Sequence, residues 1–359
     1  MVKLPKISAS QFFILLIISR MFSIFTYKPT SYNLSAALSA LAIFISVIIN
    51  FLIFLPVLWL LKRYKDRSFS DIVYLNLGNG AKLYSVIVIA VCLFLCVECV
   101  TQFEVFMTST IYTNASPLFF VIPIIAVAVY ICRLSIEALS RMSGFIFISL
   151  IFTLVAIFVA VTPQINIVWV QRIGDNESGE FLRFIAENVT TTTEVIPFMI
   201  LASYVKGNFR KTAVSFCITI GVFFEVISFL TFSVLGNYKE TIMFDFYTVA
   251  AMVESTLIER FNVAYTVLWV FMSVVRLCIY TLAAAKEIRN LRNFKNDTIP
   301  LLICAGLVLF ASVFTIQSIS YVNGLYYFIL TGMPIVVIAL IFPLVLLVVS
   351  KKKGGKNSD

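Results

Sequence analysis

The sequence contains no histidine, and only 13% of its 359 residues are charged. Without histidine, the chain has no His-ligated zinc or haem site, no Ser-His-Asp triad and no Cys-His dyad. An ordinary soluble domain has about 25% charged and about 45–50% apolar residues, so this composition excludes a water-soluble globular protein. The sequence therefore predicts a protein that is not an enzyme and that needs no metal or cofactor.

Apolar residues make up 61% of the chain, and the mean hydropathy is +1.01. They form ten segments long enough to cross a hydrocarbon core of about 30 Å at 1.5 Å per residue. We predict an all-α polytopic membrane protein with ten transmembrane helices. A single transmembrane domain would cover residues 1–350, followed by a basic cytoplasmic tail at 351–359. The predicted spans are residues 8–28, 35–61, 84–107, 117–134, 142–163, 183–204, 212–235, 264–285, 299–317 and 326–349.

The net charge of +9 comes from 27 Lys and Arg against 18 Asp and Glu. Most of the basic residues fall in alternate loops, on one side of the predicted membrane domain. Because cytoplasmic loops are enriched in Lys and Arg, we expect both termini of this multi-pass membrane protein to be cytoplasmic. This topology accounts for the positive charge without a nucleic-acid partner.

Three cysteines, Cys92, Cys96 and Cys99, have a C-x3-C-x2-C spacing that some iron–sulfur enzymes use. They lie inside an apolar segment, where a helix would carry them on one face and no loop could wrap a cluster. We interpret them as small packing residues.

Charged residues inside the predicted spans are the sharpest functional signal. Each costs about 2.5–3.5 kcal/mol at a helix centre, so they must face one another or a hydrated cavity. Five lie near the membrane midplane when depth is counted along the helices, whereas Glu104 and Glu187 fall near the outer interface, where their side chains can reach water. The midplane residues are Arg20, Glu98, Glu194, Glu225 and Arg276.

The sixth predicted span contains residues 188–194, Asn-Val-Thr-Thr-Thr-Thr-Glu, followed by Pro197. Threonines compete for backbone hydrogen bonds and proline removes a donor, so we predict local unwinding here. In the alternative reading, the threonines bond back to carbonyls one turn earlier and the helix only bends. The first span, with Arg20 and later Pro29, also has the composition of an interrupted helix.

Irregular helices at positions one and six of ten are typical of the 5+5 inverted repeat of secondary transporters. In these proteins, broken helices bind substrate near the bilayer midplane. We therefore predict broken helices 1 and 6, with repeat one at about residues 8–163 and repeat two at about 183–349.

The candidate ligand site draws on the first, third, sixth and eighth spans. Arg20 and Glu194 suit the two ends of a zwitterion, or each other. Glu98 and Gln102 form a polar stripe that could line a pathway or bond neighbouring helices, and Glu225 fits an inter-helix pair better than a ligand contact. The predicted binding residues are Ser19, Arg20, Ser23, Glu98, Gln102, Thr191, Thr192, Thr193, Glu194, Ser273 and Arg276.

A long outer loop, residues 236–263, contains apolar residues at helical spacing between Phe246 and Ile258. This pattern predicts an amphipathic helix lying on the membrane surface.

Three strings resemble the spore-germination permease family, the B subunits of nutrient germinant receptors. They are Lys-Ile-Ser-Ala-Ser-Gln at residues 6–11, Ile-Glu-Ala-Leu-Ser-Arg-Met at 136–142, and Ile-Glu-Arg-Phe-Asn at 258–262 followed by Trp269. The resemblance extends from about residue 6 to 349. It implies an amino acid/polyamine/organocation-type fold with a leucine-transporter-like core, in a bacterial cell membrane, the inner membrane of the spore.

The resemblance further implies a nutrient ligand, such as an amino acid, and assembly with A-type and C-type receptor subunits. Family members often carry glycine in the unwound part of the first span, and this first span has none. Three hypotheses stay open: a receptor subunit that binds a nutrient, a proton-coupled amino acid transporter that uses Glu98, Glu194 or Glu225 as a relay, and a scaffold that binds no ligand.

Overall fold

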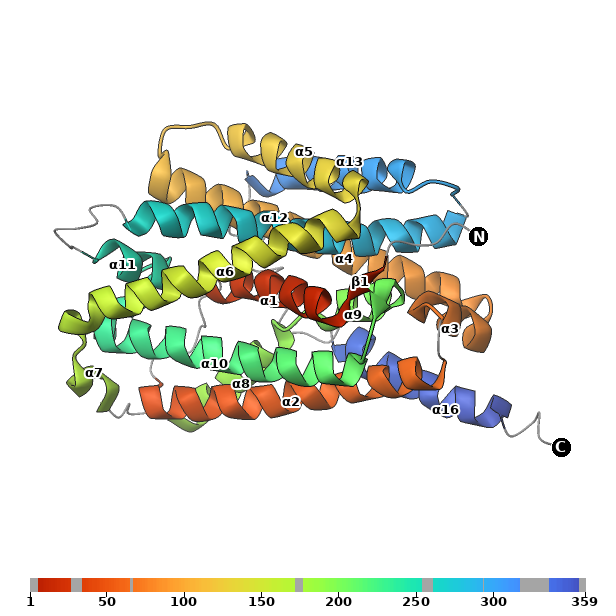
Figure 1. The fold of residues 1–359 in the computed structure, drawn as a ribbon, viewed down its shortest axis with the longest axis horizontal. Coiled ribbons are helices and arrows are strands. Elements are labelled where there is room, and N and C mark those ends of the chain that lie inside the picture. The colour runs from red at the N-terminus through yellow and green to blue at the C-terminus, as the bar shows by residue number, and fades with distance from the viewer. Residues whose placement is uncertain are drawn as a thin grey trace.

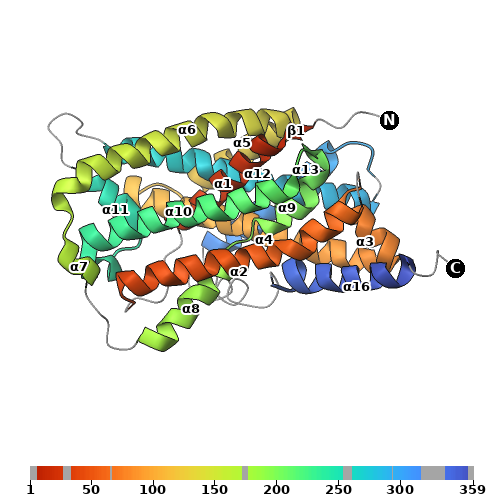
Figure 2. The same ribbon diagram turned by 60° about the horizontal axis from the view of Figure 1, so that its bottom comes forward.

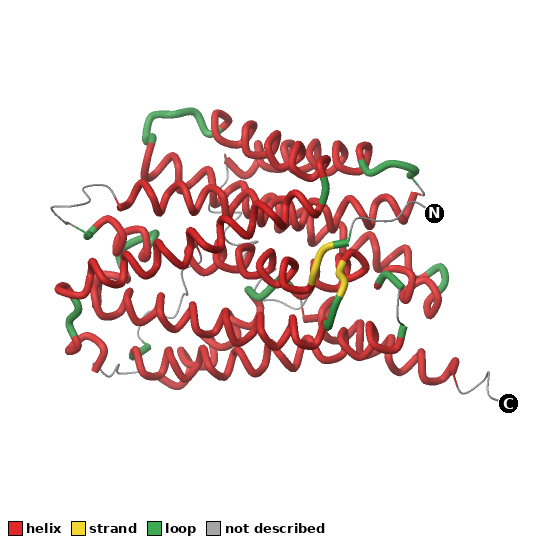
Figure 3. The backbone as a smooth tube through the Cα atoms, viewed as in Figure 1, coloured by secondary structure: helices red, strands yellow, loops and turns green. Residues whose placement is uncertain are grey.

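The chain forms a bundle of long helices that run along one axis, with a short two-stranded sheet near one end (Figures 1 and 3). The computed structural model describes residues 6–26, 34–64, 67–171, 177–253, 261–292, 294–316 and 336–354. The strands β1 (Ile7–Ser8) and β2 (Val205–Lys206) pair in parallel. We refer to the end of the bundle with this sheet and the last residues of α16, on the right in Figure 1, as the inner end, because the positive charges predict that it is cytoplasmic.

The helices follow the predicted spans closely. Short 3-10 or π turns occur at η1 (Met107–Ile111), η2 (Thr162–Gln164), η3 (Ala202–Tyr204), η4 (Gly236–Glu240) and η5 (Val337–Ile341). The α-helices are α1 (Ala9–Thr26), α2 (Ala36–Arg63), α3 (Phe69–Leu77), α4 (Gly80–Phe106), α5 (Leu118–Leu134), α6 (Ile136–Val161), α7 (Ile167–Gln171), α8 (Glu177–Thr190), α9 (Val195–Leu201), α10 (Phe209–Leu235), α11 (Asp245–Ala251), α12 (Phe261–Arg292), α13 (Thr298–Ile316) and α16 (Phe342–Gly354).

Within the described residues, seven helices are long and apolar enough to cross a membrane, and two shorter apolar helices accompany them. This confirms an all-α, multi-pass membrane protein. The count of ten stays a prediction, because the sixth span is divided into α8 and α9 and part of the tenth, residues 326–335, lies outside the described residues.

The helices α1 and α12 lie at the centre of the bundle. In the most apolar stretch of α12, 78% of the residues are buried, whereas the share in α13 is 28%. A helix that is apolar on all sides is suited to such a position, and α12 packs against α1, α4, α5, α6 and α13. The central pair is therefore shielded from lipid by the surrounding helices.

The break in the sixth span is confirmed. The helix α8 ends at Thr190, α9 begins at Val195, and the residues between them are non-helical. The threonine hydroxyls also bond back, from Thr191 to the Glu187 carbonyl at 2.8 Å and from Thr192 to the Asn188 carbonyl at 2.9 Å. Both mechanisms considered for this segment operate together, because the back-bonding hydroxyls occupy the carbonyls at the end of α8. Figure 2 shows α8 beside α2, which it contacts.

The predicted interruption of the first span is wrong for the described part. The helix α1 is continuous from Ala9 to Thr26 and carries Arg20 in its middle. Ser19 and Arg20 bond to the break in the sixth span, and Thr26 bonds back to the Phe22 carbonyl at 2.7 Å without interrupting the helix. Pro29 lies outside the described residues.

The outer loop helix was also misplaced by the sequence pattern. The helix α11 buries Phe246, Val249 and Ala250 against the bundle, at 3%, 0% and 1% exposure. It packs on α10 and α12, so its apolar face is covered by protein and does not face lipid. The end of the predicted segment, residues 254–258, lies outside the described residues.

Candidate ligand-binding site at the helix break

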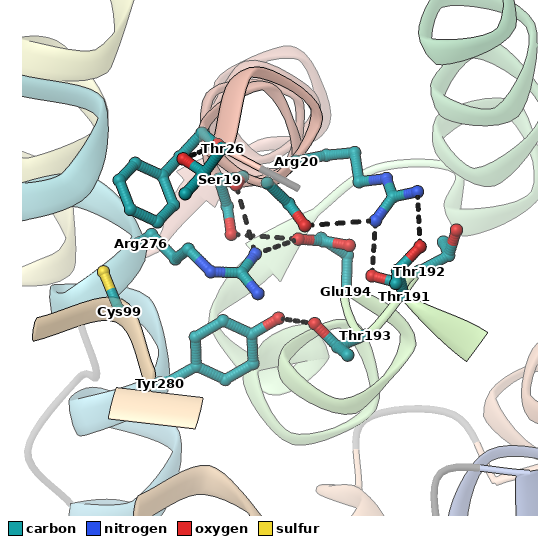
Figure 4. Close-up of polar contacts among 12 residues, drawn as sticks. Ser19, Arg20, Thr26, Cys99, Thr191, Thr192, Thr193, Glu194, Arg276 and Tyr280 are labelled. Atoms are coloured by element: carbon teal, nitrogen blue, oxygen red, sulfur yellow. Dashed lines mark hydrogen bonds and ion pairs between the residues drawn. The ribbon is translucent and has the colours of Figure 1, made fainter. Parts of the chain in front are cut away.

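An ion pair between Glu194 and Arg276 lies at the centre of the site (Figure 4). Glu194 stands directly before α9, and its Oε1 atom is 2.9 Å from Nη1 of Arg276, which extends from α12. Both residues are buried, at 0% and 2% exposure. Ser19 of α1 completes the group, because its hydroxyl donates to Glu194 Oε1 at 3.2 Å and its carbonyl accepts from Arg276 at 3.2 Å.

A second carboxylate shares the same guanidinium. Glu98 of α4 lies 3.7 Å from Nη2 of Arg276. The guanidinium also sits 5.1 Å from the ring centroid of Tyr280 and 5.9 Å from that of Phe22, within cation–π range. Arg276 thus compensates two buried acids, each of which would be costly alone in a membrane.

Arg20 ties α1 to the end of α8. Its guanidinium donates to the carbonyl of Thr191, to Thr191 Oγ1 at 3.1 Å and to the carbonyl of Asn188 at 3.4 Å. A further bond reaches Ser23 at 3.4 Å. Carbonyls at a helix C-terminus lack intrahelical donors and carry the negative end of the helix dipole, which explains why a cation is placed there.

The other threonines of the break contact two further helices. Thr193 shares a hydrogen bond with the hydroxyl of Tyr280 on α12. Asn50 of α2 donates to Thr192 at 3.0 Å. The non-helical segment is therefore held from three sides, by α1, α2 and α12.

Most of the predicted site residues come together in this network. They are Ser19, Arg20, Ser23, Glu98, Thr191, Thr192, Thr193, Glu194 and Arg276. Two do not join it. Ser273 donates to the Val270 carbonyl of its own helix at 2.6 Å, and half-buried Gln102 makes no hydrogen bond or ion pair with any described residue.

Asn50 and Tyr280 belong to the network but were not among the predicted site residues. Tyr280 follows Arg276 by four residues and so shares its helix face, and Asn50 is an amide within an apolar span. Both signals were present in the sequence. The expected exposure of Glu104 and Glu187 at the outer interface was wrong, since each is 2% exposed and each is bonded, to Thr108 and Arg183 respectively.

Two atoms of the central ion pair have unused hydrogen-bonding capacity. Glu194 Oε2 and Arg276 Nε are buried and have no hydrogen-bond partner among the described residues. The two arginines and two glutamates of the site carry formal charges that sum to zero. The arrangement can accept a hydrogen bond from an ammonium group and donate one to a carboxylate. No group of three or more Cys, Asp or Glu residues within the described chain could hold a metal ion.

Aromatic rings cover the outer side of this site. Trp269 is fully buried, and its ring centroid is 4.3 Å from that of Phe106 and 5.0 Å from that of Phe22. Its indole donates to Thr26 Oγ1 at 3.2 Å. We call these rings the outer aromatic cluster: Phe22, Phe25, Phe103, Phe106, Phe246, Tyr265 and Trp269.

Hydrogen bonds from charged groups close the inner side. Lys286 of α12 donates to the Ile200 carbonyl and the Ser203 hydroxyl, both at 2.5 Å. Its neighbour Glu287 accepts from Ser70 of α3 and from Ser85 of α4, the latter at 2.9 Å. We call these residues the inner polar network. The eighth predicted span ends at residue 285, just before Lys286, whereas α12 continues to Arg292 and buries this lysine.

A bundle of membrane helices with an ion-paired site at a helix break belongs to the architectural class of secondary transporters. The structure is similar to a solved structure of a Na⁺-coupled sialic acid symporter in a substrate-bound, outward-open state. The TM-score is 0.62 at 11% identity, over 89% of this chain and 75% of the symporter chain. This likeness shows the leucine-transporter type of fold.

The family model described as spore germination protein, the spore permease family, matches residues 6–322, so the chain belongs to that family. No curated protein sequence matches it significantly. Family and fold point to a transporter or receptor in a membrane, not to an enzyme.

Proposed function

We propose that this protein is the B subunit of a spore nutrient germinant receptor. It binds an amino acid or similar small nutrient at the break between α8 and α9 and signals through A-type and C-type partner subunits. It lies in the spore inner membrane with both termini in the cytoplasm. The buried ion pair of Glu194 and Arg276, with its unused hydrogen-bonding atoms, is the observation that supports this function most directly.

The charges of the site favour a ligand of zero net charge. Because the arginines and glutamates balance, a ligand with net charge would leave an unpaired charge in a low-dielectric region. A zwitterion offers an ammonium for Glu194 Oε2 and a carboxylate for the guanidinium donors. Thr192 and Thr193 lie next to Glu194 and can supply further hydrogen bonds to a small polar ligand.

The nutrient dose response of spores tests whether the ligand binds at the helix break. Spores that lack the gene are complemented with Thr192→Ala or Glu194→Gln, and release of core small molecules is followed for single amino acids and sugars. We expect the half-maximal nutrient concentration to shift by at least about tenfold. This shift corresponds to about 1.4 kcal/mol of binding free energy, which is the contribution of one hydrogen bond to a charged or polar ligand. Immunoblots of spore membranes verify protein amount.

Thr190→Ala is the matched control. Thr190 is also buried, but within the described part of the chain its hydroxyl bonds only to the Ala186 and Glu187 carbonyls of its own helix. Its dose response should equal that of the wild type. If both site variants respond like the control, the ligand does not bind at the helix break.

A proton-coupled amino acid permease is the second candidate. The intramembrane carboxylates Glu98 and Glu194 and the symporter-like fold favour it, because acids inside membrane spans serve as proton relays. Purified protein in proteoliposomes would then accumulate an amino acid only under a proton gradient. If the protein accumulates no amino acid in proteoliposomes but still shifts the germination response, the permease function is excluded and only the receptor function remains.

A further inference from the structure

A groove opens between α2 and α10 in the outer half of the bundle. Its volume is about 370 Å³, and residues of α2, α6, α7 and α10 line it. Phe158 and Phe229 at its edges are each 41% exposed. In a membrane-spanning bundle, apolar side chains exposed in this way face lipid, so the groove can be reached from within the bilayer.

A carboxylate, Glu225, lies in this groove, whose other lining residues are apolar except Ser228. Glu225 is ten residues before Leu235, the end of α10, which places it about 15 Å from the outer end of the helix. Its neighbours on the helix, Phe224 and Val226, are apolar. Glu225 is therefore within the hydrocarbon region, where an ionisable side chain requires a partner.

The chain does not supply that partner within the part that the structure describes. Glu225 forms no hydrogen bond or ion pair with any described residue. Among the described residues, Lys239 beyond the end of α10 does not pair with Glu225: its Nζ lies 3.1 Å from the ring centroid of Phe232, two helical turns beyond Glu225. This contrasts with Glu98 and Glu194, which share the guanidinium of Arg276.

We propose that this groove receives a transmembrane helix of a partner subunit and that a Lys or Arg of that helix pairs with Glu225. The opposite wall consists of Ala36, Ala37 and Ala40, and such small side chains allow two helix backbones to approach closely. A lipid tail would leave the carboxylate without a partner. A second copy of this chain, docked by the same face, would bring two Glu225 carboxylates together, which like-charge repulsion opposes.

The experiment uses the A-type receptor subunit as the partner, and this choice rests on the proposed function. Both full-length subunits are co-expressed, the B chain is affinity-tagged, and the A-type subunit recovered after detergent solubilisation is quantified without nutrient. We expect Ala40→Phe, which fills the groove, and Glu225→Leu, which removes the charge, each to reduce recovery at least about tenfold. Glu225→Gln, which keeps a hydrogen-bonding side chain, should fall between Glu225→Leu and the wild type.

Val222→Phe is the control, because Val222 is 57% exposed on the same helix and does not line the groove. Its recovery should be unchanged, and membrane levels and gel-filtration profiles show whether each variant is folded. Glu225→Lys should lose the partner and regain it when a basic intramembrane residue of the A-type subunit is changed to Glu.

Undiminished recovery with folded Ala40→Phe and Glu225→Leu variants would overturn the proposal, as lipid alone would then occupy the groove. Recovery of a differently tagged second copy of this chain, lost in the same variants, would overturn it in favour of a homodimer. Because recovery is measured without nutrient, it is independent of the dose response at the helix break. The groove variants could lose the partner while Thr192→Ala and Glu194→Gln respond to nutrient like the wild type. That result would contradict the ligand site but support the interface at the groove.

Discussion

The two sides of the central ion pair are closed by opposite chemistry. On the outer side, Phe22 and Trp269 pack ring against ring, and their contacts depend on shape and volume. On the inner side, Lys286 and Glu287 hold the end of the sixth span, α3 and α4 through directed hydrogen bonds. Phenylalanine rings can repack without leaving a polar group unsatisfied, and the bond from the Trp269 indole to Thr26 joins two neutral groups. A buried ammonium or carboxylate that loses its partners is strongly destabilised.

This difference favours exchange of ligand with the outer side. Opening the outer aromatic cluster would expose apolar surface, a cost that new packing can offset in part. Opening the inner polar network would separate Lys286 and Glu287 from several partners at once. A site that opens to one side and stays closed on the other fits a sensor of external nutrient better than a carrier that must open to both.

The largest expected effect is that of Trp269→Ala. Removing a fully buried indole leaves a cavity among Phe22, Phe103 and Phe106 and should lower the free energy of unfolding by about 4 kcal/mol. Thermal unfolding of the detergent-solubilised protein measures it. Trp59→Ala is the matched control, because Trp59 is 54% exposed and should cost little. Equal losses in the two variants would contradict a volume-dependent outer closure.

The next effect, about 3 kcal/mol, is expected for Lys286→Met. Methionine preserves most of the side-chain volume, so the loss reports the two hydrogen bonds to Ile200 and Ser203. Opening of the inner side is measured by maleimide labelling of a cysteine introduced by Ala202→Cys, at a position that is 2% exposed. Labelling from the inner side should rise about tenfold when Lys286→Met is also present. All seven native cysteines are buried, so background labelling is low.

Lys82→Met controls for loss of positive charge, since Lys82 is exposed. It should change neither stability nor labelling. If Lys286→Met behaves like Lys82→Met, the inner closure does not depend on directed polar bonds, and the contrast with the outer side disappears.

The sequence revealed those parts of the structure that follow from local chemistry. The run of threonines with Glu194 and Pro197 predicted the break between α8 and α9, because hydroxyl and proline chemistry act within one helical turn. Hydropathy located nearly every long helix. The same local argument failed for α1, where Arg20 looked disruptive but bonds to carbonyls 168 or more residues away in the sequence.

Most residues of the central network were named from the sequence because a charge inside a membrane must have a partner, and their binding of a ligand stays a prediction. That rule brought together Glu98, Glu194 and Arg276 but could not assign the pairs, since depth along a helix does not fix the direction in which a side chain points. It overlooked Lys286 and Glu287, which stand beyond the end of an apolar run and resemble loop residues. Glu287 bonds to Ser70 of α3, a helix too short for hydropathy to detect, and Lys286 bonds to the end of the sixth span.

The smallest effect is expected for Phe25→Leu, and it tests the contrast most finely. Phe25 stacks on Phe246 at 4.9 Å and meets the edge of Tyr265 at 5.4 Å, with no polar bond to lose. Leucine keeps the site apolar, and repacking should limit the loss in stability to about 1 kcal/mol. If the outer cluster controls entry, germination of these spores should also begin sooner at low nutrient concentration. A loss as large as that of Lys286→Met would mean that the outer rings are as rigidly specified as the inner hydrogen bonds, and the preference for outward opening would have no physical basis.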